Sequence, residues 1–134
     1  MRHNLPLRCL VCVLGAALPL PAANRYFIED QTVPGGGTGI GIYLMADLDQ
    51  TIYGFSFGVN YDEAVLTVTE VTVEGTVILP TAFTDGDGGF FDGIIDPARG
   101  LVGYACVPDF GLPFDDAIPA GTGKALAKLV VDVK

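Results

Sequence analysis

The residues of this sequence that could carry out chemistry are almost all carboxylates. The 134-residue chain has 16 Asp and Glu, one His and 3 Cys. His3, Cys9 and Cys12 lie in an N-terminal segment that we expect to be removed, and Ser56 is the only serine of the remainder. A Ser-His-Asp or Cys-His arrangement, or a zinc site of His and Cys, cannot then be assembled. Two carboxylates could serve a glycosidase, but with sixteen acids such pairs are uninformative, so we expect no enzyme.

Calcium binding is the second chemistry that the carboxylates suggest. Asp85 and Asp87, with Asp92 and Asp96 further on, could supply oxygen ligands. Counted from Asp85, however, the sixth position of the loop is Phe90 where a calcium loop needs glycine, and no helix follows. A solvated turn explains this run, and we expect no cofactor, with calcium left as the alternative.

The N-terminus has the order of a secretory signal peptide. Basic residues precede an apolar run from Cys9 to Leu18, and prolines and the small pair Ala22-Ala23 follow it. The run is too short to span a bilayer. We therefore predict a signal peptide over residues 1–23 and a secreted domain over residues 24–134. A buried N-terminal strand is the alternative.

Removal of this segment leaves an acidic protein. Five basic residues then face sixteen acidic ones, a formal charge of −11 against −9 for the full sequence. Such a chain offers no counter-charge to nucleic acid or to an anionic membrane. The remaining cysteine, Cys106, lies between Ala105 and Val107 on an apolar segment. We expect it to be a small buried hydrophobic residue rather than a reactive thiol.

The strongest element signal is a strand at residues 52–61. Its large apolar residues alternate with small and polar ones, which predicts one buried face and one nearly bare face. We expect this strand to be the centre of the core, since large side chains dominate burial energy. The inward residues are Tyr53, Phe55, Phe57, Val59 and Tyr61, and the outward residues are Gly54, Ser56, Gly58 and Asn60.

The rest of the chain reads as further strands separated by turns. With 18 Gly, 9 Pro and no long helix-forming run, the composition indicates one all-β domain. A four-residue turn at residues 97–100 predicts a hairpin between residues 90–96 and 101–107. Irregular segments are expected at 76–89 and 108–123, and further strands at 25–30, 38–48, 65–73 and 124–134.

The central segment resembles cohesin domains, which are extracellular modules of the carbohydrate-binding-module-like β-sandwich superfamily. The motif is Phe57-x-x-Asn60-Tyr61-Asp62-x-x-Val65-Leu66, followed in order by Phe91-Asp92, Pro97-x-Arg99, Tyr104 and Ala127-x-Leu129. The resemblance covers about residues 25–134. It implies a jelly-roll or immunoglobulin-like β-sandwich of nine strands. We therefore expect the chain to be a C-terminally incomplete fragment, truncated before its last strands.

The resemblance also implies a binding function. Cohesins attach dockerins in polysaccharide-degrading assemblies, through the outward face of the central strand and the hairpin. On this chain the matching partner-binding residues are Gly54, Ser56, Asp92, Ile94, Asp96 and Ala105. Gly54 and Ser56 replace an Asn-x-Asp pair of cellulosomal cohesins. The resemblance therefore supports the fold more strongly than it supports the identity of the partner. We expect a secreted or cell-surface module that binds a dockerin-like protein.

The alternative is a carbohydrate-binding module that binds polysaccharide directly. The sequence has no tryptophan, the usual platform for sugar stacking, although Tyr43 and Tyr53 could serve if exposed. The surface around Gly54 and Ser56 separates the two functions. A flat, polar surface favours a protein partner, and an aromatic strip favours sugar.

Overall fold

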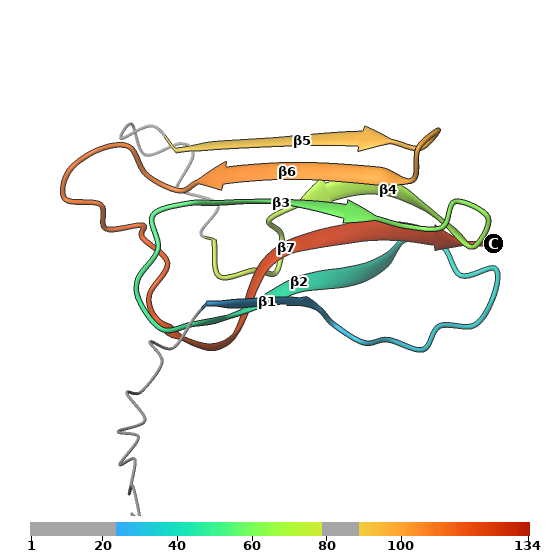
Figure 1. Cartoon of the computed structure of the whole chain (residues 1–134), viewed down its shortest axis with the longest axis horizontal. Coiled ribbons are helices and arrows are strands. Elements are labelled where there is room, and N and C mark those ends of the chain that lie inside the picture. Colours follow the sequence, from blue (N-terminus) through green and yellow to red (C-terminus); the bar gives the residue numbers. More distant parts are fainter. Residues whose placement is uncertain (1–23, 79–88) are drawn as a thin grey trace, which may run out of the picture.

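The computed structural model of the protein describes residues 24–78 and 89–134 (Figure 1). The signal peptide predicted for residues 1–23 lies outside the described residues, as do Asp85 and Asp87 of the calcium hypothesis. No helix is present in the described ranges, and hence none that could cross a membrane.

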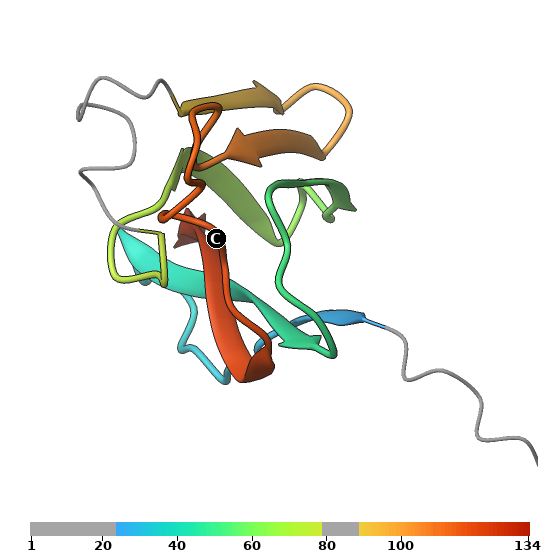
Figure 2. The ribbon, with the colours of Figure 1, turned by 90° about the vertical axis from the view of Figure 1, so that its left-hand side faces the viewer.

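In the described ranges, seven strands form two antiparallel sheets that face each other as a β-sandwich (Figures 1 and 2). This confirms the all-β fold class. One sheet has the order β1-β2-β7-β4 and the other the order β3-β6-β5. The strands are β1 (Arg25–Ile28), β2 (Ile40–Leu48), β3 (Phe55–Asn60), β4 (Leu66–Thr72), β5 (Phe90–Asp96), β6 (Leu101–Val107) and β7 (Gly121–Val133).

The predicted hairpin is confirmed residue for residue by β5 and β6. Its turn ends at Gly100, which has a φ of +58° that an L side chain rarely adopts. The β6 residues that alternate inward are Val102, Tyr104 and Cys106, and all three are buried. Cys106 has no exposed surface, so the prediction of a small buried hydrophobic residue is also confirmed.

The prediction that residues 52–61 form the centre of the core is wrong. Among the described residues β3 pairs with β6 alone, so it is an edge strand. Its inward Phe55 and Phe57 are half-buried, although their rings lie 5.6 and 5.1 Å from that of Tyr104. Burial depends on what lies beside and opposite a strand, which the local pattern does not contain. Tyr53, predicted to point inward, precedes the strand and is 58% exposed.

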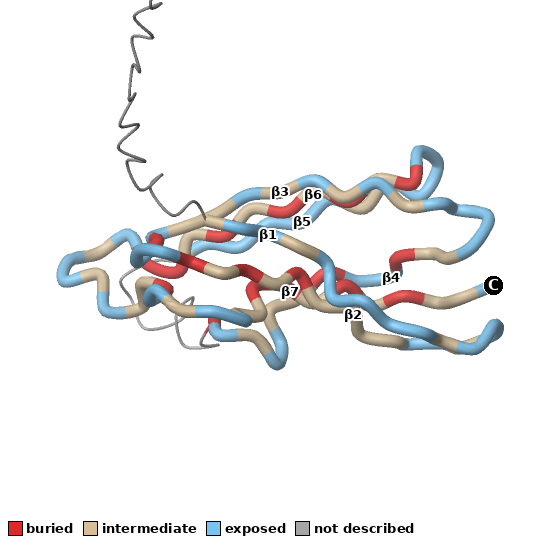
Figure 3. Tube along the Cα trace, turned by 60° about the horizontal axis from the view of Figure 1, so that its bottom comes forward, coloured by how far each residue is buried: buried red, intermediate tan, exposed pale blue. Residues whose placement is uncertain are grey.

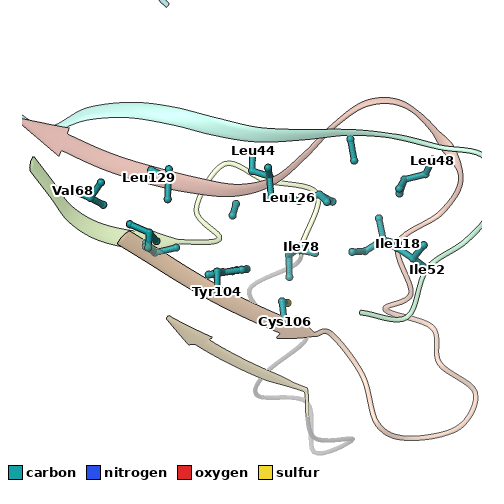
Figure 4. Packing of buried hydrophobic residues seen from close by; sticks show 14 of the residues in the cluster. Leu44, Leu48, Ile52, Val68, Ile78, Tyr104, Cys106, Ile118, Leu126 and Leu129 are labelled. Carbon is teal, nitrogen blue, oxygen red and sulfur yellow. The ribbon is translucent and has the colours of Figure 1, made fainter. Parts of the chain in front are cut away.

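The centre of the core is β7, a strand of thirteen residues that pairs with β2 on one side and β4 on the other. A register shift between Leu44 and Met45 interrupts its pairing with β2. Strict alternation therefore fails in this strand, and the consecutive residues Leu126 and Ala127 are both buried. Figure 4 shows Leu126 among the side chains that fill the space between the sheets.

Connecting segments complete one end of this core. Ile52 and Ile118 exchange two backbone hydrogen bonds of 2.9 Å and join the β2–β3 connection to the loop before β7. Both side chains are buried, as is that of Ile78 (Figure 4). These contacts fix the β2–β3 connection and the loop before β7 at the end of the sandwich where β3 begins. Figure 3 shows that buried residues also occur along β6 and β7.

Candidate binding face

The outward side of the β3-β6-β5 sheet is the surface that the sequence predicted to bind a partner. The register places Ser56 opposite Ala105, and Ala105 opposite Asp92. Three of the predicted residues from three strands therefore form one row across the sheet. We call this surface the candidate face, and its outward residues are Ser56, Gly58, Asn60, Phe90, Asp92, Ile94, Asp96, Leu101, Gly103, Ala105 and Val107.

The middle of the candidate face is shallow because two glycines lie side by side. Gly58 pairs with Gly103, and Gly103 pairs with Ile94. A Cβ atom on Gly103 would meet no heavy atom within 4 Å, and one on Gly58 would approach nothing closer than 3.9 Å. The Ile94 side chain beside them is 66% exposed. An apolar side chain thus stands next to open backbone, an arrangement that lets a partner approach closely.

Gly54 differs from the other predicted residues. It lies just before β3 and is half-buried. A Cβ atom on Gly54 would lie 2.9 Å from the carbonyl oxygen of Cys106. The approach of the β6 backbone therefore explains why a glycine is needed at this position.

The candidate face carries negative charge. Asp92 and Asp96 flank Ile94 on the same side of β5, separated by about 14 Å along the strand. The Arg99 guanidinium in the turn lies 3.6 Å from a carboxylate oxygen of Asp96, as an exposed ion pair of small energetic value. The basic residue Lys128 lies on the other sheet, so it does not offset this negative charge. The charge of this face therefore favours a basic partner.

Exposed aromatic residues lie at the loop end of the candidate face, and the sequence reasoning missed them. Phe90 continues the outward side of β5, and its ring stacks on that of Phe110 with centroids 6.0 Å apart. Phe110 is 59% exposed and the nearby Leu112 is 81% exposed. Period-two spacing from Asp92 could have identified Phe90. Phe110 lies in an irregular loop that has no periodicity to reveal it.

A pocket of about 370 Å³ opens beside the candidate face, between β4 and β5. Its walls combine an aromatic ring, a hydroxyl and two carboxylates with aliphatic groups. The residues that line it are Thr69, Glu70, Val71, Phe91, Asp92, Gly93 and Ile95.

The two tyrosines that could serve as sugar platforms if exposed do not form one surface. Tyr53 packs edge-on against Phe114, with ring centroids 5.5 Å apart. Tyr43 is half-buried on β2, in the other sheet, where its hydroxyl lies close to Gly75. The two rings therefore have different neighbours and do not act together.

The groups beneath the candidate face are suited to packing. Burial raises the pKa of the Cys106 thiol to about 11. Burial also raises the pKa of the Tyr104 hydroxyl, and the neighbouring Cys106 adds to this rise. The thiol is therefore protonated at neutral pH and is not a nucleophile. Among the described residues, no cluster of three or more His, Cys, Asp or Glu side chains could hold a metal ion.

No protein-family model matches this chain, and no curated protein matches it either. The resemblance to cohesins therefore rests on the motifs in the sequence.

Proposed function

We propose that this chain is a non-catalytic, extracellular binding module that resembles cohesins and attaches a dockerin-like protein. The observation that carries the proposal is the candidate face itself. It is a three-stranded surface that no described segment covers, and Ile94 stands exposed on it beside Gly58 and Gly103. Exposed apolar side chains near the middle of an open surface are typical anchors of protein interfaces. The biological setting that we propose is polysaccharide degradation or attachment at the cell surface.

The outer face of the other sheet is a weaker candidate. There Lys128 donates a hydrogen bond of 3.1 Å to Glu74, and Asp132 accepts one of 2.8 Å from the backbone of Gly39. These polar groups already have partners within the chain. The contrast supports the β3-β6-β5 sheet as the side that meets another protein.

The substitution Ser56→Arg tests the proposal. Ser56 is exposed and points outward, so the free energy of unfolding should change by no more than about 0.5 kcal/mol. Binding should weaken by about 2 kcal/mol because a bulky charged side chain blocks close approach. The measurement is calorimetric titration with dockerin-bearing proteins of the source organism.

Thr122→Arg is the matched control, since it adds the same charge at an exposed site of β7 in the other sheet. It should leave binding unchanged. If wild type and Ser56→Arg bind a dockerin-bearing protein equally well, the candidate face is not the docking surface.

The second candidate function is direct binding of polysaccharide. The pocket between β4 and β5 favours it, because an aromatic ring beside hydroxyl and carboxylate groups suits a sugar. Affinity electrophoresis in gels containing soluble xylan or β-glucan tests this function. Retardation that is lost in Glu70→Ala but kept in Ser56→Arg would favour it over protein attachment.

A further inference from the structure

The pocket between β4 and β5 is lined by acidic residues that no described cation pairs with. Glu70 comes from β4 and Asp92 from β5, and none of the described residues that line the pocket is basic. The ion pairs of the described residues engage Asp47, Asp96 and Glu74 instead. The walls of the pocket therefore carry negative charge that remains uncompensated within the described part of the chain.

Lys128 of β7 and Arg99 of the hairpin turn are engaged with other acids. Lys128 donates a hydrogen bond of 3.1 Å to Glu74, and this bond is the main cause that raises the pKa of the ammonium group. The charge of Glu70 adds to that rise to a smaller degree. Arg99 lies beside Asp96, at 3.6 Å from a carboxylate oxygen. A cation from outside the chain can therefore approach the acids of the pocket.

An aromatic ring lines the same pocket. Phe91 is 37% exposed, and its ring packs on that of Tyr104 with centroids 4.8 Å apart and planes at 51°. Because Tyr104 is buried, it holds the Phe91 ring in place. The face of such a ring attracts a cation through its quadrupole, and neighbouring carboxylates attract it through their charge. The same face packs well against the flat, apolar side of a sugar ring.

We propose that this pocket binds an amino-sugar polymer. The ammonium group of a glucosamine unit would meet the carboxylates of Glu70 and Asp92, and its sugar ring would pack on Phe91. The volume of about 370 Å³ lies near the lower end of the range for small-molecule pockets, which suits a short stretch of sugar rather than a folded element of a protein. This ligand class rests on the second proposed function, direct binding of polysaccharide, and is independent of the protein partner of the candidate face.

A lysine side chain of a peptide would satisfy the pocket less well. Its ammonium group stands at the end of a narrow aliphatic chain, which leaves the face of the Phe91 ring largely uncovered. A glucosamine unit carries the ammonium group directly on a flat ring. One unit therefore makes the electrostatic contact and the stacking contact together.

The test is calorimetric titration with two sugar oligomers in a mildly acidic buffer. One is a hexamer of glucosamine and the other is the hexamer of N-acetylglucosamine, which has the same backbone without the positive charge. We expect the glucosamine hexamer to bind about tenfold more tightly. Its binding should weaken with added salt, because ions screen the attraction between exposed charges.

Two variants separate the contribution of charge from that of stacking. Glu70 is exposed, so Glu70→Gln should fold normally, and it should weaken binding of the glucosamine hexamer by about fivefold without affecting the acetylated one. Phe91→Leu should weaken both hexamers, since stacking does not depend on charge. Glu29→Gln is the matched control, because it makes the same change at an exposed site after β1, at the opposite edge of the same sheet. It should leave both affinities unchanged.

The possible failures are distinguishable. Equal binding of the two hexamers, weakened by Phe91→Leu, would overturn the preference for amino sugars and keep the function of polysaccharide binding. No binding of either hexamer would overturn the site, and with no retardation by xylan or β-glucan it would remove the second proposed function as well. Tetralysine that binds as tightly as the glucosamine hexamer would overturn the choice of a sugar, and an equal loss in Glu29→Gln would overturn the role of the pocket.

Discussion

At the scale of single residues, the most unusual environment is that of Cys106 and Tyr104, two inward residues of β6. Both lie beneath the candidate face, and the Tyr104 hydroxyl has no oxygen or nitrogen partner among the residues that the structure describes. Burial disfavours the ionised form of each group, so it raises the pKa of both. The fold should therefore lose stability when the pH becomes high enough to ionise these groups.

The first prediction concerns this linkage. The pKa of the Cys106 thiol is about 11 in the folded chain, against an ordinary value of 9.0. A raised pKa contributes stability that is fully present below pH 9 and is lost as the pH rises toward 11. Urea unfolding measured from pH 8 to 11 should show that the free energy of unfolding falls as the pH rises. The fall should be smaller in Cys106→Ala. Equal pH slopes for the two proteins would contradict this assignment, as would rapid reaction of the native thiol with Ellman's reagent.

At the scale of elements, the β5–β6 hairpin is held by its turn glycine. Gly100 has a positive φ, and a Cβ atom at this position would collide with the carbonyl oxygen of Tyr61. Its own carbonyl accepts a hydrogen bond of 2.8 Å from the Tyr61 amide. The turn of the hairpin therefore also fixes the end of β3, and with it the register of the candidate face.

The second prediction compares two glycines of this hairpin. Gly100→Ala should destabilise the domain by about 1–3 kcal/mol, since it combines backbone strain with a steric clash. Gly103→Ala should be neutral or slightly stabilising, because its Cβ atom meets nothing and alanine costs less backbone entropy in a strand. The urea midpoints of the two variants provide the measurement. Similar losses in both would show that the collision at Gly100 does not govern stability.

At the scale of the whole molecule, the described sandwich is organised around β7, while β1 and β3 are edge strands of its two sheets. Leu126, Leu129 and Val131 of β7 are buried, whereas Phe55 and Phe57 of β3 are only half-buried. The aromatic strand thus contributes to the wall of the core and not to its centre.

The third prediction follows from this arrangement. Leu126→Ala leaves a cavity between the sheets and should cost about 2–5 kcal/mol. Phe57→Ala should cost about 1–3 kcal/mol, less than a fully buried phenylalanine, because water already reaches part of its ring. Denaturation midpoints rank the two variants. A larger loss for Phe57→Ala would restore β3 as the centre of the core.

The sequence by itself determined the fold class, the approximate positions of the strands and, where no register shift intervenes, the sides of the strands. Alternation with a period of two is a local property, so it correctly separated Ser56 and Gly58 from Phe55 and Phe57. Turn residues between two alternating runs likewise located the β5–β6 hairpin. The candidate face could therefore be predicted, except for Phe110 in its irregular loop.

Only the tertiary structure decided which strand is central, which edges are free and how deeply each inward side chain is buried. These properties depend on pairing between distant segments, such as β2 with β7, and on the register shift that buries Leu126. They also depend on what lies opposite, which is why the inward-facing Ile28 remains exposed. The direction of a side chain follows from its own backbone, whereas its burial follows from the rest of the molecule.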